Sequence, residues 1–307
     1  MASDESLHEQ LVDALVALFG SHPGFRATHA KGIVLKGDFM PSPNAASLSR
    51  AAHFQGDRIP VTVRFSNSTG LPTIPDGDPN ASPRGLAIKF HLPGDAATDV
   101  LGHSFNGFPV GTAEEFLTFL RAVATTPPGA EPSDELKAFL SNHPQALAFA
   151  VTPKPAPVSF ATISYFGVNA FRFINAAGDV KLGRYFIRPV AGEHYLTPET
   201  ASTQPPDYLS EEIVARLSTG AAQFRLMIQI AAPGDPTHDA SLSWPSDRQE
   251  VEAGLLSITE TVPDSATLQR SLIFDPVRLT DGIELSDDPL PAVRSGVYSV
   301  SYRRRNG

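Results

Sequence analysis

The feature that most constrains the fold of this chain is a series of short segments with strand-like patterns. In most of them apolar and polar residues alternate, and the longest is rich in aromatic and β-branched residues. These strand candidates are residues 33–35, 61–66, 85–90, 162–175, 180–189, 224–231, 255–262 and 271–274. Alternation with a period of two is typical of strands, and few of the segments are joined by long helices. The pattern predicts an α+β fold in which about eight antiparallel strands form a sheet or barrel with flanking helices.

Capping signals mark the expected helices. Ser6 and Glu9 form a capping box ahead of leucines that recur at helical spacing until Gly20, and Thr112 and Glu115 form a second one. Shorter helices are expected near residues 134–140 and 210–217. Because no change of composition marks a boundary, residues 1–307 are expected to form a single domain.

Composition excludes several classes of function. A net charge of −9 disfavours nucleic acid as a partner, since phosphate binding needs a basic surface. Without cysteine, disulfides, thiolate metal sites and cysteine nucleophiles are excluded, so a metal would need His, Tyr or carboxylate ligands. No apolar run is long enough to span a bilayer, and the first residues lack a signal-peptide pattern. A cytoplasmic protein without a membrane partner is therefore expected.

A tyrosine near the C-terminus is a candidate metal ligand. Arg294 precedes Tyr298 by four residues, which places both side chains on one face of a helix. A guanidinium in that position stabilises a phenolate, and tyrosinate is one of the protein ligands used for haem iron. An Arg/Tyr pair at this spacing is more often a solvated helix face, so the pair alone does not decide.

Other candidates also carry two interpretations. His29 lies among small residues that would admit a planar ligand, yet a lone histidine is usually structural. Arg64 lies within a strand candidate and Arg84 at the start of another, where each would be either exposed or buried with an anionic partner. The basic run of residues 303–305 is either a solvated tail or an anion site. No phosphate-binding loop, dinucleotide fingerprint, nucleophile elbow or zinc spacing is present.

Taken in order, these segments resemble the catalase family. The motifs similar to the distal side of the catalase site are Arg26-x-x-His29-Ala-Lys-Gly32, Arg64-Phe-Ser66 and Pro83-Arg84-Gly-x-Ala-x-Lys-Phe90. Those similar to the proximal side are Phe274-Asp-Pro276, Gly282-Ile-Glu284, Ser286 and Arg294-x-x-x-Tyr298. Trp244-Pro245 is similar to a catalase motif as well. The resemblance covers roughly residues 26–305.

The resemblance implies a catalase-like barrel with haem b held between the barrel and the C-terminal helix. Tyr298 would be the iron ligand, and Arg294 would keep it as phenolate. His29 would be the distal histidine that moves the proton of the peroxide, oriented by Ser66. The arginines that the resemblance pairs with the haem propionates are Arg26, Arg64 and Arg305.

One position departs from the catalase pattern. Catalases carry a distal Asn after Asp-x-x-Gly, whereas here Asp99-Val-Leu-Gly102 is followed by His103 and Ser104. An ungapped match places His103 or Ser104 at the Asn position. A shifted loop would bring Asn106 there instead, and Asn106 is the residue that we expect to position the peroxide.

The short chain implies a small catalase-related peroxidase. It lacks the long N-terminal arm and the C-terminal region of a full catalase, so a more open haem, weak catalase activity and a monomer or homodimer are expected. The substrates would be hydrogen peroxide or organic hydroperoxides, together with a small organic reductant. Two alternatives stay open. A fatty-acid hydroperoxide isomerase of the allene oxide synthase type would share the barrel, but its distal pocket is expected to carry Thr where this chain has Ser66. A haem carrier or sensor is the non-enzymatic alternative.

Overall fold

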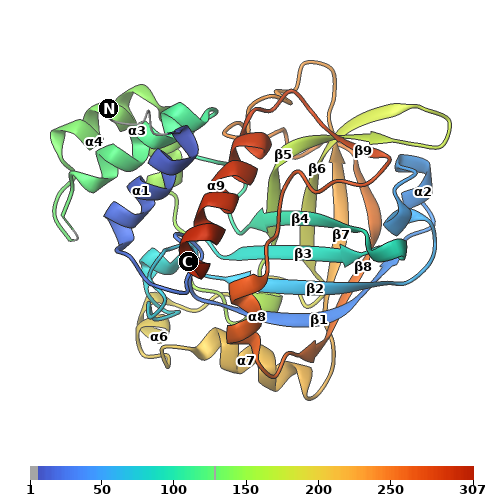
Figure 1. Ribbon diagram of the computed structural model, residues 1–307, viewed down its shortest axis with the longest axis horizontal. Coiled ribbons are helices and arrows are strands. Elements are labelled where there is room, and N and C mark those ends of the chain that lie inside the picture. Colours follow the sequence, from blue (N-terminus) through green and yellow to red (C-terminus); the bar gives the residue numbers. More distant parts are fainter. Residues whose placement is uncertain (1–5, 128) are drawn as a thin grey trace.

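A closed β-barrel forms the centre of the protein in the computed structural model, which describes residues 6–127 and 129–307 (Figure 1). Within these residues the strands pair antiparallel in the order β4-β3-β2-β1-β8-β7-β6-β5-β9, and pairing of β4 with β5 closes the first eight. The strands are β1 Gly32–Pro41, β2 Ile59–Ser66, β3 Gly85–His91, β4 Ala97–His103, β5 Tyr165–Ile174, β6 Val180–Pro189, β7 Ala222–Ile230, β8 Glu250–Thr261 and β9 Ile283–Leu285.

The helices lie outside the barrel. They are α1 Leu7–Phe19, α2 Ala45–Leu48, α3 Ala113–Ala124, α4 Asp134–Asn142, α5 Pro144–Val151, α6 Pro198–Ser202, α7 Tyr208–Leu217, α8 Ser265–Ser271 and α9 Leu290–Asn306. Single 3₁₀ turns occur at Ala52–Phe54, Pro79–Ala81, Pro93–Asp95 and Phe160–Thr162. Helix α9 runs between the barrel and a group formed by α1, α3 and α4 (Figure 1). None of the helices in the described residues is long and apolar enough to cross a membrane.

Alternation along the strands divides the barrel into an apolar interior and a more varied outer face. Phe65 on β2 and Leu86 on β3 are buried in the main hydrophobic cluster. The ring of Phe65 stacks on that of Phe160 with centroids 5.0 Å apart. The residues that alternate with Phe65 point to the opposite face, which is the face that α9 covers.

The predicted α+β fold with an eight-stranded antiparallel barrel is confirmed, and both capping boxes are formed. Two strands, β4 and β9, were not predicted. The strand expected at residues 271–274 is wrong, because Ser271 ends α8 and the following residues pair with no strand. There the carbonyl of Leu272 accepts hydrogen bonds from arginine side chains rather than from a neighbouring strand.

A histidine lies in the apolar core without a polar partner. The ring of His53 packs 4.2 Å from that of Phe54 and 4.7 Å from that of Phe90, measured between centroids. Neither of its ring nitrogens has a hydrogen-bond partner among the described residues. Burial lowers the pKa of His53 from 6.5 to about 3, because the charged ring cannot be solvated there.

We predict that His53→Leu loses less stability than the wild type when the pH is lowered from 7 to 5. Between pH 6.5 and pH 3, His53 binds a proton in the unfolded chain but not in the folded chain. The contribution of this residue to the free energy of unfolding is therefore fully present above pH 6.5 and decreases as the pH falls. At pH 5 the loss from this one residue is about 2 kcal/mol. Urea unfolding at pH 7 and pH 5, without added ligand, should show that much less loss in His53→Leu than in the wild type. His238→Leu, at an exposed histidine, is the control, and an equal effect there would refute the assignment.

Candidate functional site

A cavity lies between the outer face of the barrel and α9. It contains about 910 Å³ of space that no atom fills, part of it open to solvent. Strands β2 to β5 provide one wall, α9 the other, and the loop before β1 and the segment after α8 lie at its edges. The cavity therefore joins segments from both ends of the chain.

The barrel wall of the cavity follows from strand alternation. Arg64 and Ser66 line the cavity, whereas Phe65 between them points into the core. Their partners on β3 are Ala87 and Gly85, respectively. A Cβ atom on Gly85 would lie 2.6 Å from the Ser66 Oγ, so only glycine leaves that contact open. Two small residues in the middle of the wall leave room for a flat group.

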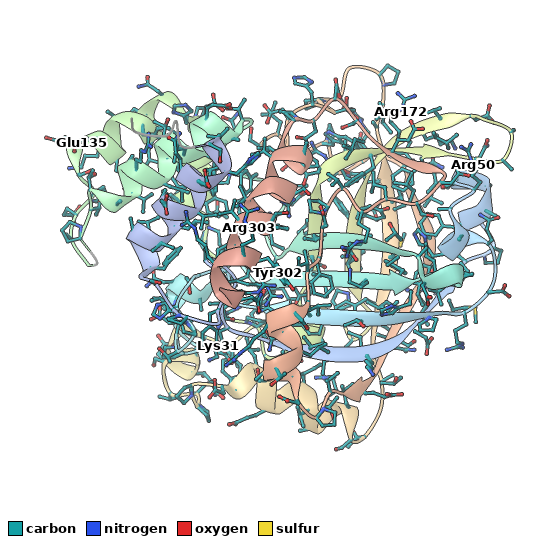
Figure 2. The ribbon with its side chains drawn as sticks, in the orientation of Figure 1. Lys31, Arg50, Glu135, Arg172, Tyr302 and Arg303 are labelled. Atoms are coloured by element: carbon teal, nitrogen blue, oxygen red, sulfur yellow. The ribbon has the colours of Figure 1, made fainter. Side chains whose placement is uncertain are left out.

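His29 is held against this wall by the loop that precedes β1. Its Nδ1 lies 3.0 Å from the Ser66 Oγ, as the resemblance implies. Its backbone has a φ of 54°, in the left-handed region that few non-glycine residues adopt, and its N–H donates to the carbonyl of Ser68. Two residues on, Lys31 forms ion pairs with Asp76 at 3.0 Å and Asp207 at 2.8 Å, which anchor the loop (Figure 2).

His29 is uncharged at neutral pH. Burial is the main cause that lowers its pKa from 6.5 to about 3, and the positive charges of Arg64, Arg294 and Arg26 act in the same direction. A neutral imidazole has one nitrogen with a proton and one with a lone pair, so His29 is able to accept a proton. Its Nε2 makes no hydrogen bond to the described part of the chain.

Helix α9 presents one continuous face to the cavity, on which side chains recur every three or four residues. The Tyr298 hydroxyl accepts hydrogen bonds from Arg294 Nη2 at 2.8 Å and Nε at 3.3 Å. Arg294 Nη1 in turn donates to the Asn169 Oδ1 on β5 at 2.6 Å, and the Asn169 amide donates to Asp288 at 2.8 Å. This chain of contacts holds the guanidinium against the phenol oxygen.

Three arginines meet at one edge of the cavity. Arg26 and Arg305 both donate to the carbonyl of Leu272, and Arg64 donates to Gln269 and to the carbonyl of His29. Among the described residues no carboxylate lies within ion-pair distance of any of them. Burial and the charges of the other two lower the pKa of Arg26 to about 7, and the pKa of Arg64 is lowered to about 9. Such an uncompensated positive cluster is a site for an anion that carries carboxylates.

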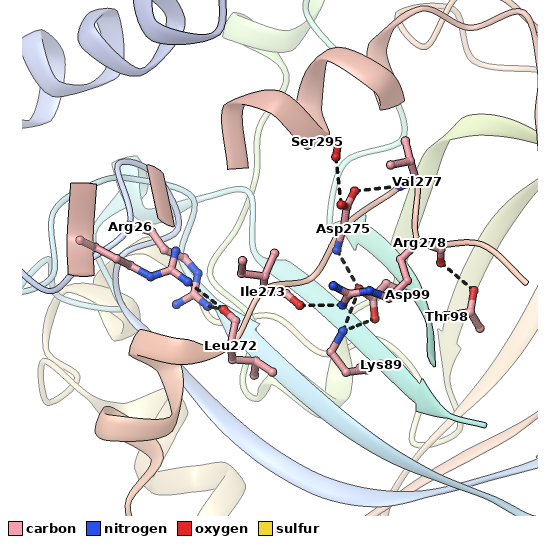
Figure 3. A network of polar contacts seen from close by, with 11 residues as sticks. Arg26, Lys89, Thr98, Asp99, Leu272, Ile273, Asp275, Val277, Arg278 and Ser295 are labelled. Carbon is pink, nitrogen blue, oxygen red and sulfur yellow. Dashed lines mark hydrogen bonds and ion pairs between the residues drawn. The ribbon is translucent and has the colours of Figure 1, made fainter. Parts of the chain in front are cut away.

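A polar network ties α9 to the barrel below the cavity (Figure 3). The buried carboxylate of Asp99 on β4 accepts from Lys89 at 2.7 Å and from Arg278 at 2.9 Å. It also accepts from the backbone N–H of Asp275, whose own carboxylate accepts from Ser295 on α9 at 2.9 Å. Asp99 therefore connects β3 and β4 to the segment before α9 and, through Asp275, to α9 itself.

The structure brings seven of the eight residues expected at the site into one cavity: His29, Ser66, Arg26, Arg64, Arg294, Tyr298 and Arg305. Asn106 does not line it, and the contact recorded for Asn106 is its backbone carbonyl, which accepts from the Ser243 hydroxyl at 2.6 Å. His103 occupies the cavity wall instead.

Other candidates from the sequence lie outside the cavity. Arg84 is fully buried, with Asn67 and the carbonyls of Asp76 and Ala81 as its partners. In the basic run, Arg303, which Figure 2 labels, is exposed, whereas Arg305 is buried and lines the cavity. Sequence reasoning missed Asn169, although it is the single amide in a strand whose residues, apart from Arg172, are mostly apolar.

The residues of the cavity fit a flat, mostly apolar cofactor with carboxylates and a metal ion. Leu, Val and Phe side chains form most of the remaining walls, the small residues of β3 leave room, and the arginines are unpaired. In the described residues no group of three or more His, Asp and Glu side chains is arranged to hold a metal ion. The phenol of Tyr298 is the candidate ligand, and a metal here would come with its own further ligands.

Comparison with known proteins agrees with these features. Residues 18–307 match the sequence profile of the family described as Catalase. The chain is 39% identical over 302 residues to a catalase-related peroxidase from Mycolicibacterium paratuberculosis, covering 97% of this chain and 95% of that protein. It is 34% identical over 301 residues to a catalase-related peroxidase from Synechococcus elongatus, covering 97% of this chain and 88% of the relative. A catalase from Pseudomonas syringae is 28% identical over 298 residues, which are 92% of this chain and 58% of that protein.

We predict that Asp99→Asn destabilises the protein by about 3 kcal/mol, because it leaves a buried lysine without its charge partner. The free energy of unfolding from urea denaturation measures this. The control is Asp281→Asn, which breaks an exposed pair with Arg50 and should leave stability nearly unchanged. Equal effects of the two substitutions would contradict the role assigned to Asp99.

Proposed function

Because this chain belongs to the catalase family, we propose that it is a haem-dependent peroxidase. It would reduce hydrogen peroxide or organic hydroperoxides with a small organic electron donor and have weak catalase activity. The observation that carries the proposal is the meeting of two pairs in one cavity, His29 with Ser66 and Arg294 with Tyr298. The near full-length similarity to proteins named peroxidases favours this activity over an isomerase or a haem carrier.

The residues that would hold haem b divide by chemistry. Tyr298 would bind the iron as a phenolate, and Arg294 would stabilise that charge. The haem carboxylates would pair with Arg26, Arg64 and Arg305, whose charges have no carboxylate partner among the described residues. When bound, haem supplies the redox chemistry that couples the peroxide to the electron donor.

His29 would move the proton. With Nδ1–H donating to the Ser66 Oγ, the lone pair of Nε2 accepts the proton of the peroxide and then returns it to the leaving oxygen. Overall ROOH takes up two electrons from the donor and two protons, and yields ROH and water. Ser66 keeps the ring in the orientation and tautomer that this transfer requires.

We predict that the purified protein, loaded with haem, shows a Soret band and that Tyr298→Phe abolishes it or shifts it strongly, because the phenol oxygen is lost. The matched control is Tyr302→Phe on the same helix, which should leave the spectrum unchanged, since Tyr302 does not line the cavity. An unchanged spectrum in Tyr298→Phe would rule out Tyr298 as the ligand.

We predict that His29→Ala keeps the Soret band but lowers kcat/KM for the peroxide by roughly 100- to 10,000-fold, the range for loss of a general acid and base. Turnover of a phenolic or dye donor measures this. Rapid sustained oxygen release without donor turnover would indicate a catalase instead. Conversion of a lipid hydroperoxide without any reductant would indicate an isomerase.

A further inference from the structure

We propose that His103 is a second distal imidazole that donates a hydrogen bond to the bound peroxide. This inference rests on the proposed function and assigns a catalytic residue to the same site. It follows from where strand pairing places His103 and from its ring nitrogens, which have no hydrogen-bond partner among the described residues.

Strand register places His103 beside the residues that hold His29. Ser66, Gly85 and His103 are successive cross-strand partners on β2, β3 and β4. Partners in register point to the same face of a sheet, so His103 faces the cavity as Ser66 does. Gly85 stands between them without a side chain, and a Cβ there would lie 2.8 Å from the His29 Nδ1. Across the gap left by Gly85, both imidazoles border the same space.

The ring of His103 lacks the hydrogen bonds that a structural histidine would have. Both of its nitrogens are buried without a partner in the described part of the chain. Of the unpartnered buried side-chain atoms there, only those of His103 belong to the cavity wall. A buried polar group without a partner costs stability, so this one is explained if a ligand completes it.

Burial and the positive charges around His103 keep its ring neutral. Burial is the main cause that lowers its pKa from 6.5 to about 3, and the positive charges of Arg294 and Lys154 add to the effect. No carboxylate contributes in the opposite direction. The ring therefore has one N–H to donate and one lone pair.

An imidazole at this position differs from an amide in one chemical respect. Both can donate an N–H to the peroxide and stabilise charge on its leaving oxygen, but only the imidazole has a nitrogen lone pair that can take up the proton during the transfer. His29 remains the main base because Ser66 orients it. His103 would accept the peroxide proton when His29 is absent, and would return it to the leaving oxygen in the same way.

The test uses the haem-loaded protein with His103→Leu, His103→Asn and, as a control, His53→Leu at the other unpartnered buried histidine. We expect His103→Leu to lower kcat/KM for hydrogen peroxide about tenfold and to weaken cyanide binding by a similar factor. A loss of this size corresponds to one hydrogen bond to a group that carries or develops charge. His103→Asn should retain both, since the amide keeps an N–H donor. His53→Leu should change neither.

Two further measurements separate the possible failures. In the protein without haem, His103→Leu should raise the free energy of unfolding, since an unpartnered polar ring is replaced. In the His29→Ala background, His103→Asn should cost at least a further tenfold in kcat/KM. If the wild type turns over peroxide but His103→Leu destabilises the haem-free protein and leaves cyanide affinity unchanged, His103 is structural and this inference fails alone. A wild type that binds no haem overturns both proposals.

Discussion

Uncompensated positive charge at one edge of the cavity is the constraint on which the rest of the site depends. The guanidinium groups of Arg26, Arg64 and Arg305 repel one another in a poorly solvated place, as the lowered pKa of Arg26 reflects. The protein offers them backbone carbonyls, among them that of Leu272, but no carboxylate from the described residues. Carbonyls orient a guanidinium without neutralising it, so the charge stays available to an anionic ligand. This explains why the segment after α8 runs as extended, unpaired chain where a strand was expected.

The barrel was predictable because it depends on local pattern. Local pattern indicates seven of its eight strands, and the capping boxes set the start of α1 and α3. Strand β4 was missed because Asp99 interrupts its apolar pattern, and the groups that make this burial possible, Lys89 and Arg278, lie 10 and 179 residues away. Interactions over such separations leave no periodic signal in the sequence.

Much of the candidate site was also predictable, but from the order of motifs rather than from local pattern. Each candidate residue, whether histidine, tyrosine or arginine, had a more common structural interpretation. Only the order of these residues along the chain favoured a functional site. The sequence did not decide between His103, Ser104 and Asn106 at the distal position, because a shift of a few residues in the loop determines which of them lines the cavity. Pairing of β4 with β3 places His103 opposite Gly85, in the cavity wall. Asn169 was missed since its role depends on Arg294 and Asp288, more than a hundred residues further on.

The joining of distant segments in one cavity has a consequence for synthesis. The backbone N–H of Ala27 binds the Ser301 hydroxyl across 274 residues of chain. At 5–20 residues per second, a ribosome needs roughly 15–50 seconds to cover that separation. During that interval the loop with Arg26 and His29 has been synthesised, whereas α9, which forms the opposite wall, has not. The pocket is therefore completed only after α9 has been synthesised, and until α9 docks a nascent chain would expose the charged side chains of the other wall.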